Sequence, residues 1–252
     1  MKRFLLVLGI AVLEIGSAEP TDNNSGLRVP VLLELFTSEG CSSCPPADTL
    51  LDRFEKSQPV SGANVIVLSE HVDYWDEGGW KDPFSSAGLT IRQRDYARQF
   101  GLDSVYTPQL VVDGQTQFVG SDESEAYDAT AKAARRPKAP VQAALVDRSD
   151  AKLNVRVGFA SMAGGDATVF VALTERHAES QVGSGENSGR HLRHVAVVRA
   201  LVRAGTVKAG ETFSKLVGVS IPRGAGRDGW RVVVFVQERS NGRMLGVTQL
   251  EL

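Results

Sequence analysis

The sequence has only two cysteines, Cys41 and Cys44, among its 252 residues. So few cysteines exclude a small fold held together by a disulfide network, and no second cysteine pair is present to complete a structural zinc site. A bridge between the two would close a very short loop and stabilise the fold by only about 2 kcal/mol. A chain of this length rarely needs so small a constraint, so the pair is a candidate for chemistry.

The sequence also lacks a long apolar run and an excess of basic residues. The apolar run at residues 4–13 is too short to span a membrane, and with Gly16 and Ala18 after it, it is typical of a signal peptide cleaved after Ala18. We therefore expect residues 1–18 to be removed and the mature protein to be secreted or periplasmic, without stable insertion in a membrane. The formal net charge of −2 does not indicate a nucleic-acid partner.

The cysteines lie between an expected strand and an expected helix. Residues 31–36 form an apolar run of strand length that is interrupted only by Glu34. Pro45 and Pro46 lack amide donors and fit the first turn of a helix, where such donors would have no partner. At this junction the unpaired amides and the helix dipole would stabilise a thiolate at Cys41. The sequence thus places the pair where dithiol chemistry requires it.

The following segments predict an alternation of strands and helices. The run at 64–68 completes a β–α–β unit with parallel strands, so His71, just beyond its end, is expected near Cys41. Pro108 opens a further strand and is tolerated there only at the first position or in a cis turn. The other expected features are a helix at 89–100, a hairpin turn at Asp113 and Gly114, a strand at 116–119 and a helix at 124–135 capped by Ser121 or Asp122.

These features carry a resemblance to a known family. The Cys-Ser-Ser-Cys motif at 41–44 and the Thr-Pro pair at 107–108, in the order β, α, β, α, β, β, α, resemble the thioredoxin fold, whose dithiol faces a cis-proline. More narrowly, the segments around these motifs and around His71 are similar to a family of secreted bacterial thioredoxin-like proteins of unassigned function. The resemblance implies an α/β, thioredoxin-like fold for residues 30–136, and it implies no particular substrate.

Two positions depart from the thioredoxin pattern. Thioredoxins usually carry an aromatic residue just before the first cysteine and a buried acid six residues before it, and here these positions hold Gly40 and Leu35. Glu34 lies one place further back. Either the turn holds an extra residue and Glu34 is the proton relay of the site, or its side chain points to the other face of the sheet. We favour the relay.

The second half of the chain has a different character. Residues 19–29 and 137–140 are predicted linkers, and residues 141–252 are predicted to form a smaller, β-sandwich-like domain. Its seven expected strands lie at 141–146, 153–159, 167–175, 194–202, 213–221, 230–238 and 244–250. His191 and His194 are expected to be surface or core residues rather than metal ligands.

The function that fits these features best is thiol–disulfide exchange. Cys41 would be the nucleophile, and Cys44 would resolve the mixed disulfide. Pro108 would border Cys41, and a protonated His71 would lower the pKa of the Cys41 thiol. The candidates for lining a substrate groove are Thr107, Tyr74, Trp75 and Trp80. We expect protein thiols or disulfides as substrates, no cofactor and, because there is no third cysteine, a separate redox partner that recycles the pair.

Two alternatives remain open. Cys41, Cys44 and His71 offer the soft thiolate and imidazole ligands that copper prefers, so the protein would then be a copper-binding protein or metallochaperone. Secreted copper-delivery proteins of this fold usually have three residues between the cysteines, however, and here there are two. The second alternative is a non-catalytic thioredoxin-like binding module whose β-domain carries the function.

Overall fold

The computed structural model describes residues 28–222 and 229–252, so the expected signal peptide and most of the first linker lie outside the described residues. The strands are β1 (Val29–Thr37), β2 (Ala63–His71), β3 (Gln109–Val112), β4 (Thr116–Val119), β5 (Gln142–Arg148), β6 (Lys152–Phe159), β7 (Ala167–Gln181), β8 (His191–Val207), β9 (Phe213–Ser220), β10 (Trp230–Glu238) and β11 (Met244–Glu251). The helices are α1 (Pro45–Ser57), α2 (Ala87–Phe100), α3 (Glu123–Ala133) and the short 3-10 helix η1 (Asp76–Gly78).

Most of the local expectations are confirmed. Helix α1 begins at Pro45, and the Asp122 side chain caps α3 by accepting a hydrogen bond from the backbone N–H of Glu125. The turn between β3 and β4 places Asp113 at φ 52° and Gly114 at φ 66°, the left-handed region that a tight hairpin requires. The peptide bond before Pro108 is cis. All seven strands expected in the second half are present.

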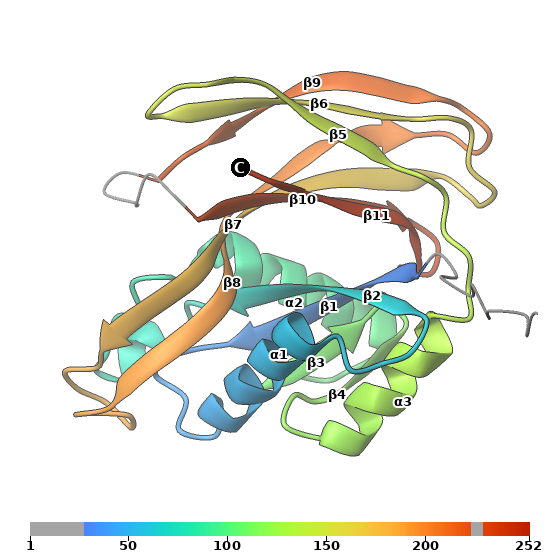
Figure 1. Cartoon of the computed structure of the whole chain (residues 1–252). Coiled ribbons are helices and arrows are strands. Elements are labelled where there is room, and N and C mark those ends of the chain that lie inside the picture. Colours follow the sequence, from blue (N-terminus) through green and yellow to red (C-terminus); the bar gives the residue numbers. More distant parts are fainter. Residues whose placement is uncertain (1–27, 223–228) are drawn as a thin grey trace, which may run out of the picture.

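Eight of the strands form one mixed sheet, in the order β11-β10-β7-β8-β2-β1-β3-β4 (Figure 1). Strands β1 and β2 are parallel, whereas β3 is antiparallel to β1. Strand β8 meets the edge of β2 at the parallel pair Ser69 and Val197, so strands from the second half of the chain continue the sheet of the first half. Strands β5, β6 and β9 form a separate three-stranded sheet.

This arrangement shows that the expected fold class was wrong. We expected an α/β, thioredoxin-like fold followed by a smaller β-sandwich. Instead the structure is mostly β, with 45% of the described residues in strands and 19% in helices, and one sheet runs through both halves. The reason lies in β7 and β8, which are 15 and 17 residues long. The long β8 lies against the edge of β2, whose backbone donors and acceptors would otherwise remain unpaired.

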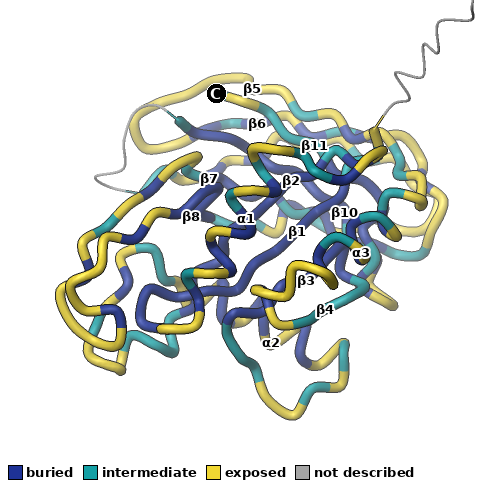
Figure 2. The backbone as a smooth tube through the Cα atoms, turned by 60° about the horizontal axis from the view of Figure 1, so that its bottom comes forward, coloured by how far each residue is buried: buried dark blue, intermediate teal, exposed yellow. Residues whose placement is uncertain are grey.

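The helices cover both faces of the first half of the sheet (Figure 1). Alternate residues of a strand point to opposite faces, so Leu33 and Leu35 pack with α1 and α3, whereas Leu32 packs with Leu89 of α2. The three-stranded sheet packs on β7 and β10 through a separate apolar core. The inner strands are buried almost throughout (Figure 2). Among the described helices, none combines the length and the apolar character needed to cross a membrane.

Candidate functional site

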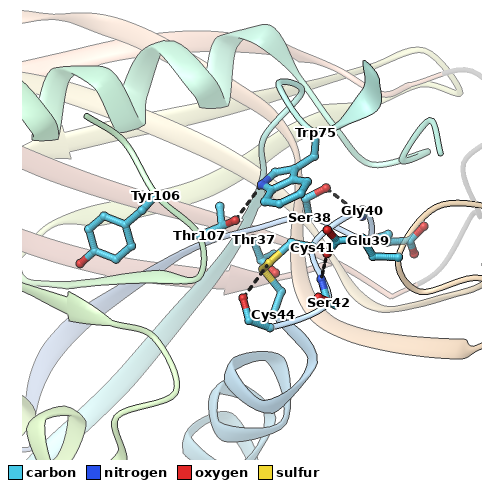
Figure 3. Close-up of a disulfide and its surroundings, with 12 residues drawn as sticks. Thr37, Ser38, Glu39, Gly40, Cys41, Ser42, Cys44, Trp75, Tyr106 and Thr107 are labelled. Atoms are coloured by element: carbon cyan, nitrogen blue, oxygen red, sulfur yellow. Dashed lines mark hydrogen bonds between the residues drawn. A yellow bond between two sulfur atoms is a disulfide. The ribbon is translucent and has the colours of Figure 1, made fainter. Parts of the chain in front are cut away.

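Cys41 and Cys44 form a disulfide in the loop between β1 and α1, residues 38–44, which we call the dithiol loop (Figure 3). Cys44 is the N-cap of α1, and its backbone N–H donates to the carbonyl of Cys41. The Ser43 hydroxyl lies 3.4 Å from Sγ of Cys41. Only 1% of Cys41 and none of Cys44 is exposed. The disulfide is therefore at the expected strand–helix junction, and both of its cysteines are buried.

Trp75 lies against the dithiol loop and connects it to the Thr-Pro segment (Figure 3). Its indole N–H donates to Oγ1 of Thr107 at 2.8 Å. A Cβ at Gly40 would lie only 3.2 Å from Cβ and 3.3 Å from the backbone carbonyl of Trp75, so a side chain there would require Trp75 to shift by a few tenths of an ångström. This close approach disfavours an aromatic residue before Cys41. Three of the expected site residues, Cys41, Trp75 and Thr107, are thus brought together.

Pro108 lies near the first turn of α1. A Cβ built at Gly120 would be 3.2 Å from both Pro108 Cβ and Ala47 Cβ, so the proline and this turn border the same small space. The backbone N–H of Ala47 donates to the carbonyl of Cys44. Pro108 is therefore close to the helix end that carries Cys44.

Tyr74 packs against the same buried cluster as Trp75, whereas Trp80 lies in different surroundings. Tyr74 packs in a buried cluster with Phe36 and Tyr96, and burial raises the pKa of its phenol. The indole N–H of Trp80 donates to Oε2 of Glu39 at 2.8 Å. Of the aromatic residues expected to line a groove, Tyr74 is thus a packing residue, and Trp80 is part of a polar network under the dithiol loop.

Glu34 is not part of the disulfide site. Alternation along β1 turns its side chain toward α2, on the face opposite α1, where it accepts hydrogen bonds from Arg92 and Tyr96. Glu70 lies beside the same guanidinium, 3.6 Å from Arg92 Nε. The expected relay role of Glu34 was therefore wrong, because the chain contains no extra residue that would shift Glu34 to the other face.

His71 lies on the disulfide side of the sheet, but its contacts are with a buried acid. Its Nδ1 is 2.7 Å from Oδ2 of Asp82, and the same oxygen accepts the backbone N–H of Glu39 at 2.9 Å. Burial opposes ionisation of Asp82, yet the neighbouring His71 and these hydrogen bonds outweigh it and lower the pKa of Asp82 to about 2. The pair fixes the start of the dithiol loop through Glu39.

His194 is the main site residue that sequence reasoning missed. Its Nε2 is 3.2 Å from Oε1 of Glu39, its Nδ1 is 3.6 Å from Oδ1 of Asp48, and its ring centroid is 4.6 Å from that of His71. Burial opposes protonation, but the two carboxylates outweigh it and raise the pKa of His194 to about 10. The available signal was weak: His194 alternates with the apolar Leu192 and Ala196, which marks an inward position.

The tip of the β7–β8 hairpin, residues 183–190, covers the dithiol loop. The amide of Asn187 donates to the backbone carbonyls of Glu39 at 2.8 Å and of Cys41 at 2.9 Å. The carboxylate of Glu186 accepts the backbone N–H of Ser42 at 2.9 Å. Neither residue was expected from the sequence, because about 145 positions separate them from the cysteines.

Replacement of Asp82 by asparagine tests the His71–Asp82 pair. The lowered pKa of Asp82 means that its ionised form contributes stability above its usual pKa of 3.8, and that this stability is lost as the pH falls toward 2. Asp82→Asn should therefore lower the free energy of unfolding by about 2 kcal/mol at pH 7. Urea unfolding at pH 7 and at pH 3 should show the difference shrinking at the lower pH. Asp103→Asn, an exposed control, should change stability by less than about 0.5 kcal/mol.

The described residues show no preformed copper site. Both thiols are joined in the disulfide, and His71 faces Asp82 and His194. In the described part of the chain, no three His, Cys, Asp or Glu side chains are arranged to hold a metal ion.

Comparisons with known proteins place the chain in a family whose function is unknown. Residues 32–237 match a family model described as a protein of unknown function, DUF1223. A crystal structure of a protein from Agrobacterium tumefaciens is 28% identical, with a TM-score of 0.69, and the match covers 88% of this chain and 94% of that chain. A domain of the outer membrane lipoprotein Omp28 from Porphyromonas gingivalis is 17% identical, with a TM-score of 0.30, over 46% of this chain and 88% of that chain. No curated protein matches significantly.

Proposed function

Because the chain belongs to the DUF1223 family, whose function is unknown, its relatives supply no activity, and we propose from the site itself that it is a thiol–disulfide oxidoreductase that acts in a secreted or periplasmic setting. The observation that carries the proposal is the pairing of the two cysteines at the first turn of α1, with Trp75 and the Thr107–Pro108 segment beside them. A bridge across so short a loop adds little stability, which favours chemistry over structure.

The exchange proceeds in two balanced steps. A thiolate of a substrate protein attacks Sγ of Cys41, forms a mixed disulfide and displaces Cys44 as a thiolate, which takes up a proton. A second substrate thiolate then attacks the substrate sulfur of the mixed disulfide and releases Cys41. The substrate loses two electrons, the cysteine pair gains them, and a separate disulfide-bearing partner reoxidises the pair. With a disulfide substrate and a dithiol partner the same steps run in reverse.

The surroundings of Cys41 suit a thiolate. The hydroxyl of Ser43, 3.4 Å from Sγ, is a donor that stabilises negative charge on the sulfur. The start of α1 adds the positive end of the helix dipole. His71 is bonded to Asp82, so the thiolate would be stabilised by the helix dipole and the Ser43 hydroxyl.

The reduction potential of the cysteine pair tests this function. In glutathione buffers, with metal-free protein, we expect a value between about −120 and −270 mV, the range of exchange catalysts. A value well below about −300 mV would identify a structural bridge and would reject the proposal. Cys44→Ser should accumulate a mixed disulfide with a disulfide-bonded peptide: its Cys41 thiolate attacks the peptide S–S bond and releases one peptide thiolate, and no Cys44 thiol is left to resolve the product. Cys41→Ser, the matched control, should accumulate none.

A further inference from the structure

The loop that carries the disulfide is covered by a part of the chain that is distant in sequence. With 1% of Cys41 exposed, an incoming thiolate cannot reach its sulfur along the S–S axis unless this loop or the groups around it move. The hairpin tip at 183–190 contacts three successive parts of the dithiol loop, namely the carbonyls of Glu39 and Cys41 and the N–H of Ser42. The covering group is therefore anchored directly to the residue that reacts.

The tip is held down by few groups. Asn187 is its only buried residue, and the other residues from 183 to 190 are exposed. The guanidinium of Arg190 donates to Oδ1 of Asn187 at 2.8 Å, which turns the amide nitrogen toward the dithiol loop. Beyond Asn187 and Glu186, the tip contacts the protein through Ser184, which donates to the carbonyl of Gly79, and through glycines that lie on Trp80.

The strands behind the tip are held much more firmly. Strands β7 and β8 pair from Ala167 and Val207 to Gln181 and His191, with two register shifts along the ladder, and the tip follows after residue 182. A segment with one buried side chain and mostly exposed hydrogen bonds opens locally at a lower free-energy cost than the ladder behind it. Opening at the tip can therefore occur while the sheet stays intact.

We propose that the hairpin tip is a displaceable cover over the dithiol loop, and that Asn187 and Glu186 are the positioning residues that hold it closed. This inference rests on the proposed exchange function. It adds that opening of the tip controls the reaction, because Cys41 reacts only in the open form. Opening frees two carbonyls and one N–H on the dithiol loop, all of which water or a partner can then bind. The rate of attack on Cys41 is set by the fraction of molecules with the tip open.

The rate at which dithiothreitol reduces the disulfide tests the cover. Dithiothreitol supplies both electrons and leaves as its own cyclic disulfide, so no other reductant is needed. Asn187→Ala removes two hydrogen bonds to the dithiol loop and should raise the rate about tenfold. Glu186→Ala removes one and should raise it about threefold. Protein thiols are trapped with a maleimide at successive times and counted by mass.

Two controls in the same tip separate loss of the cover from general disturbance. Glu186→Gln keeps an oxygen that accepts the N–H of Ser42 and should react at nearly the wild-type rate. Ser188→Ala alters a hydroxyl that donates only to Gly183 within the tip, and it should also leave the rate within about twofold. Because Glu186 is exposed, its variants keep the test valid even where Asn187→Ala fails to fold.

The urea dependence of the rate distinguishes opening of the tip from unfolding of the protein. Reduction through the open tip should depend weakly on low urea concentrations, because few residues become exposed, whereas reduction through global unfolding should follow the full m-value. The cover hypothesis would be overturned if both Asn187→Ala and Glu186→Ala were reduced at the wild-type rate. It would also be overturned if the urea dependence of reduction matched the m-value of global unfolding. The reduction potential is measured separately. A value typical of a structural disulfide would reject the exchange function, while the reduction rates would still show whether the tip acts as a cover.

Discussion

Replacing Arg92 by methionine is expected to lower the free energy of unfolding by about 3–5 kcal/mol, the largest loss we foresee for a single side chain. Arg92 is 6% exposed, and its guanidinium is the positive charge between the buried carboxyl groups of Glu34 and Glu70. Methionine fills a similar volume but leaves these acids without a counter-ion. The guanidinium also opposes the upward shift that burial and Glu34 impose on the pKa of Glu70. Urea unfolding measures the effect.

Two further variants make this result specific to charge. Arg94→Met changes an exposed arginine two positions along the same helix and should alter stability by less than about 0.5 kcal/mol. Burial and the neighbouring Glu34 raise the pKa of Glu70, so adding Glu70→Gln to Arg92→Met should recover part of the lost stability. Equal stability of Arg92→Met and the wild type would show that the buried charges are not coupled as described.

Replacing His194 by glutamine is expected to lower the free energy of unfolding by about 3–4 kcal/mol at pH 7. The pKa of His194 is raised from 6.5 to about 10 in the folded protein. A raised pKa means that the protonated ring contributes stability fully below pH 6.5, and that this contribution is lost as the pH rises toward 10. Wild type and variant should therefore differ most at pH 6 and converge by pH 10. Urea unfolding across this range measures the difference.

The groups that face His194 determine this pH dependence. Glu39 and Asp48 lie beside its two ring nitrogens, and the rings of His71 and Phe84 pack against it. His177→Gln, on β7 of the same hairpin, is the matched control, because its exposed ring has no such buried carboxylates beside it. A difference between wild type and His194→Gln that stays constant from pH 6 to pH 10 would contradict a protonated His194.

Local patterns in the sequence predicted most of the secondary structure. The apolar run at 31–36 lies within β1, the two prolines begin α1, and Asp113 with Gly114 forms the hairpin turn. These features depend on residues within a few positions of each other, which is where periodicity and turn chemistry act. The pairing of Ser69 with Val197 joins positions far apart in the chain, and no local pattern specifies it. The fold class was wrong for this reason.

The same distinction applies to the site. Cys41, Cys44 and the Thr107–Pro108 segment could be found from their positions at the ends of strands and helices. The relay role of Glu34 failed because hydrophobic alternation was not followed strictly: Leu33 and Leu35 face α1, so Glu34 must face α2. His194 reaches the site from a strand that was assigned to a separate domain, and its carboxylate partners became visible only when the chain was folded.

The contacts of Glu39 determine which segment of the chain must be transferred intact if the disulfide site is to be grafted onto another protein. Its carboxylate meets Ser180 and His194 from β7 and β8, and its carbonyl meets Asn187 from the tip between them. A fragment that ends at residue 136 contains both cysteines but none of these three partners. The disulfide site is thus not a portable module that can be shuffled between proteins. A continuous segment from β1 to β8 is needed to include all of these residues.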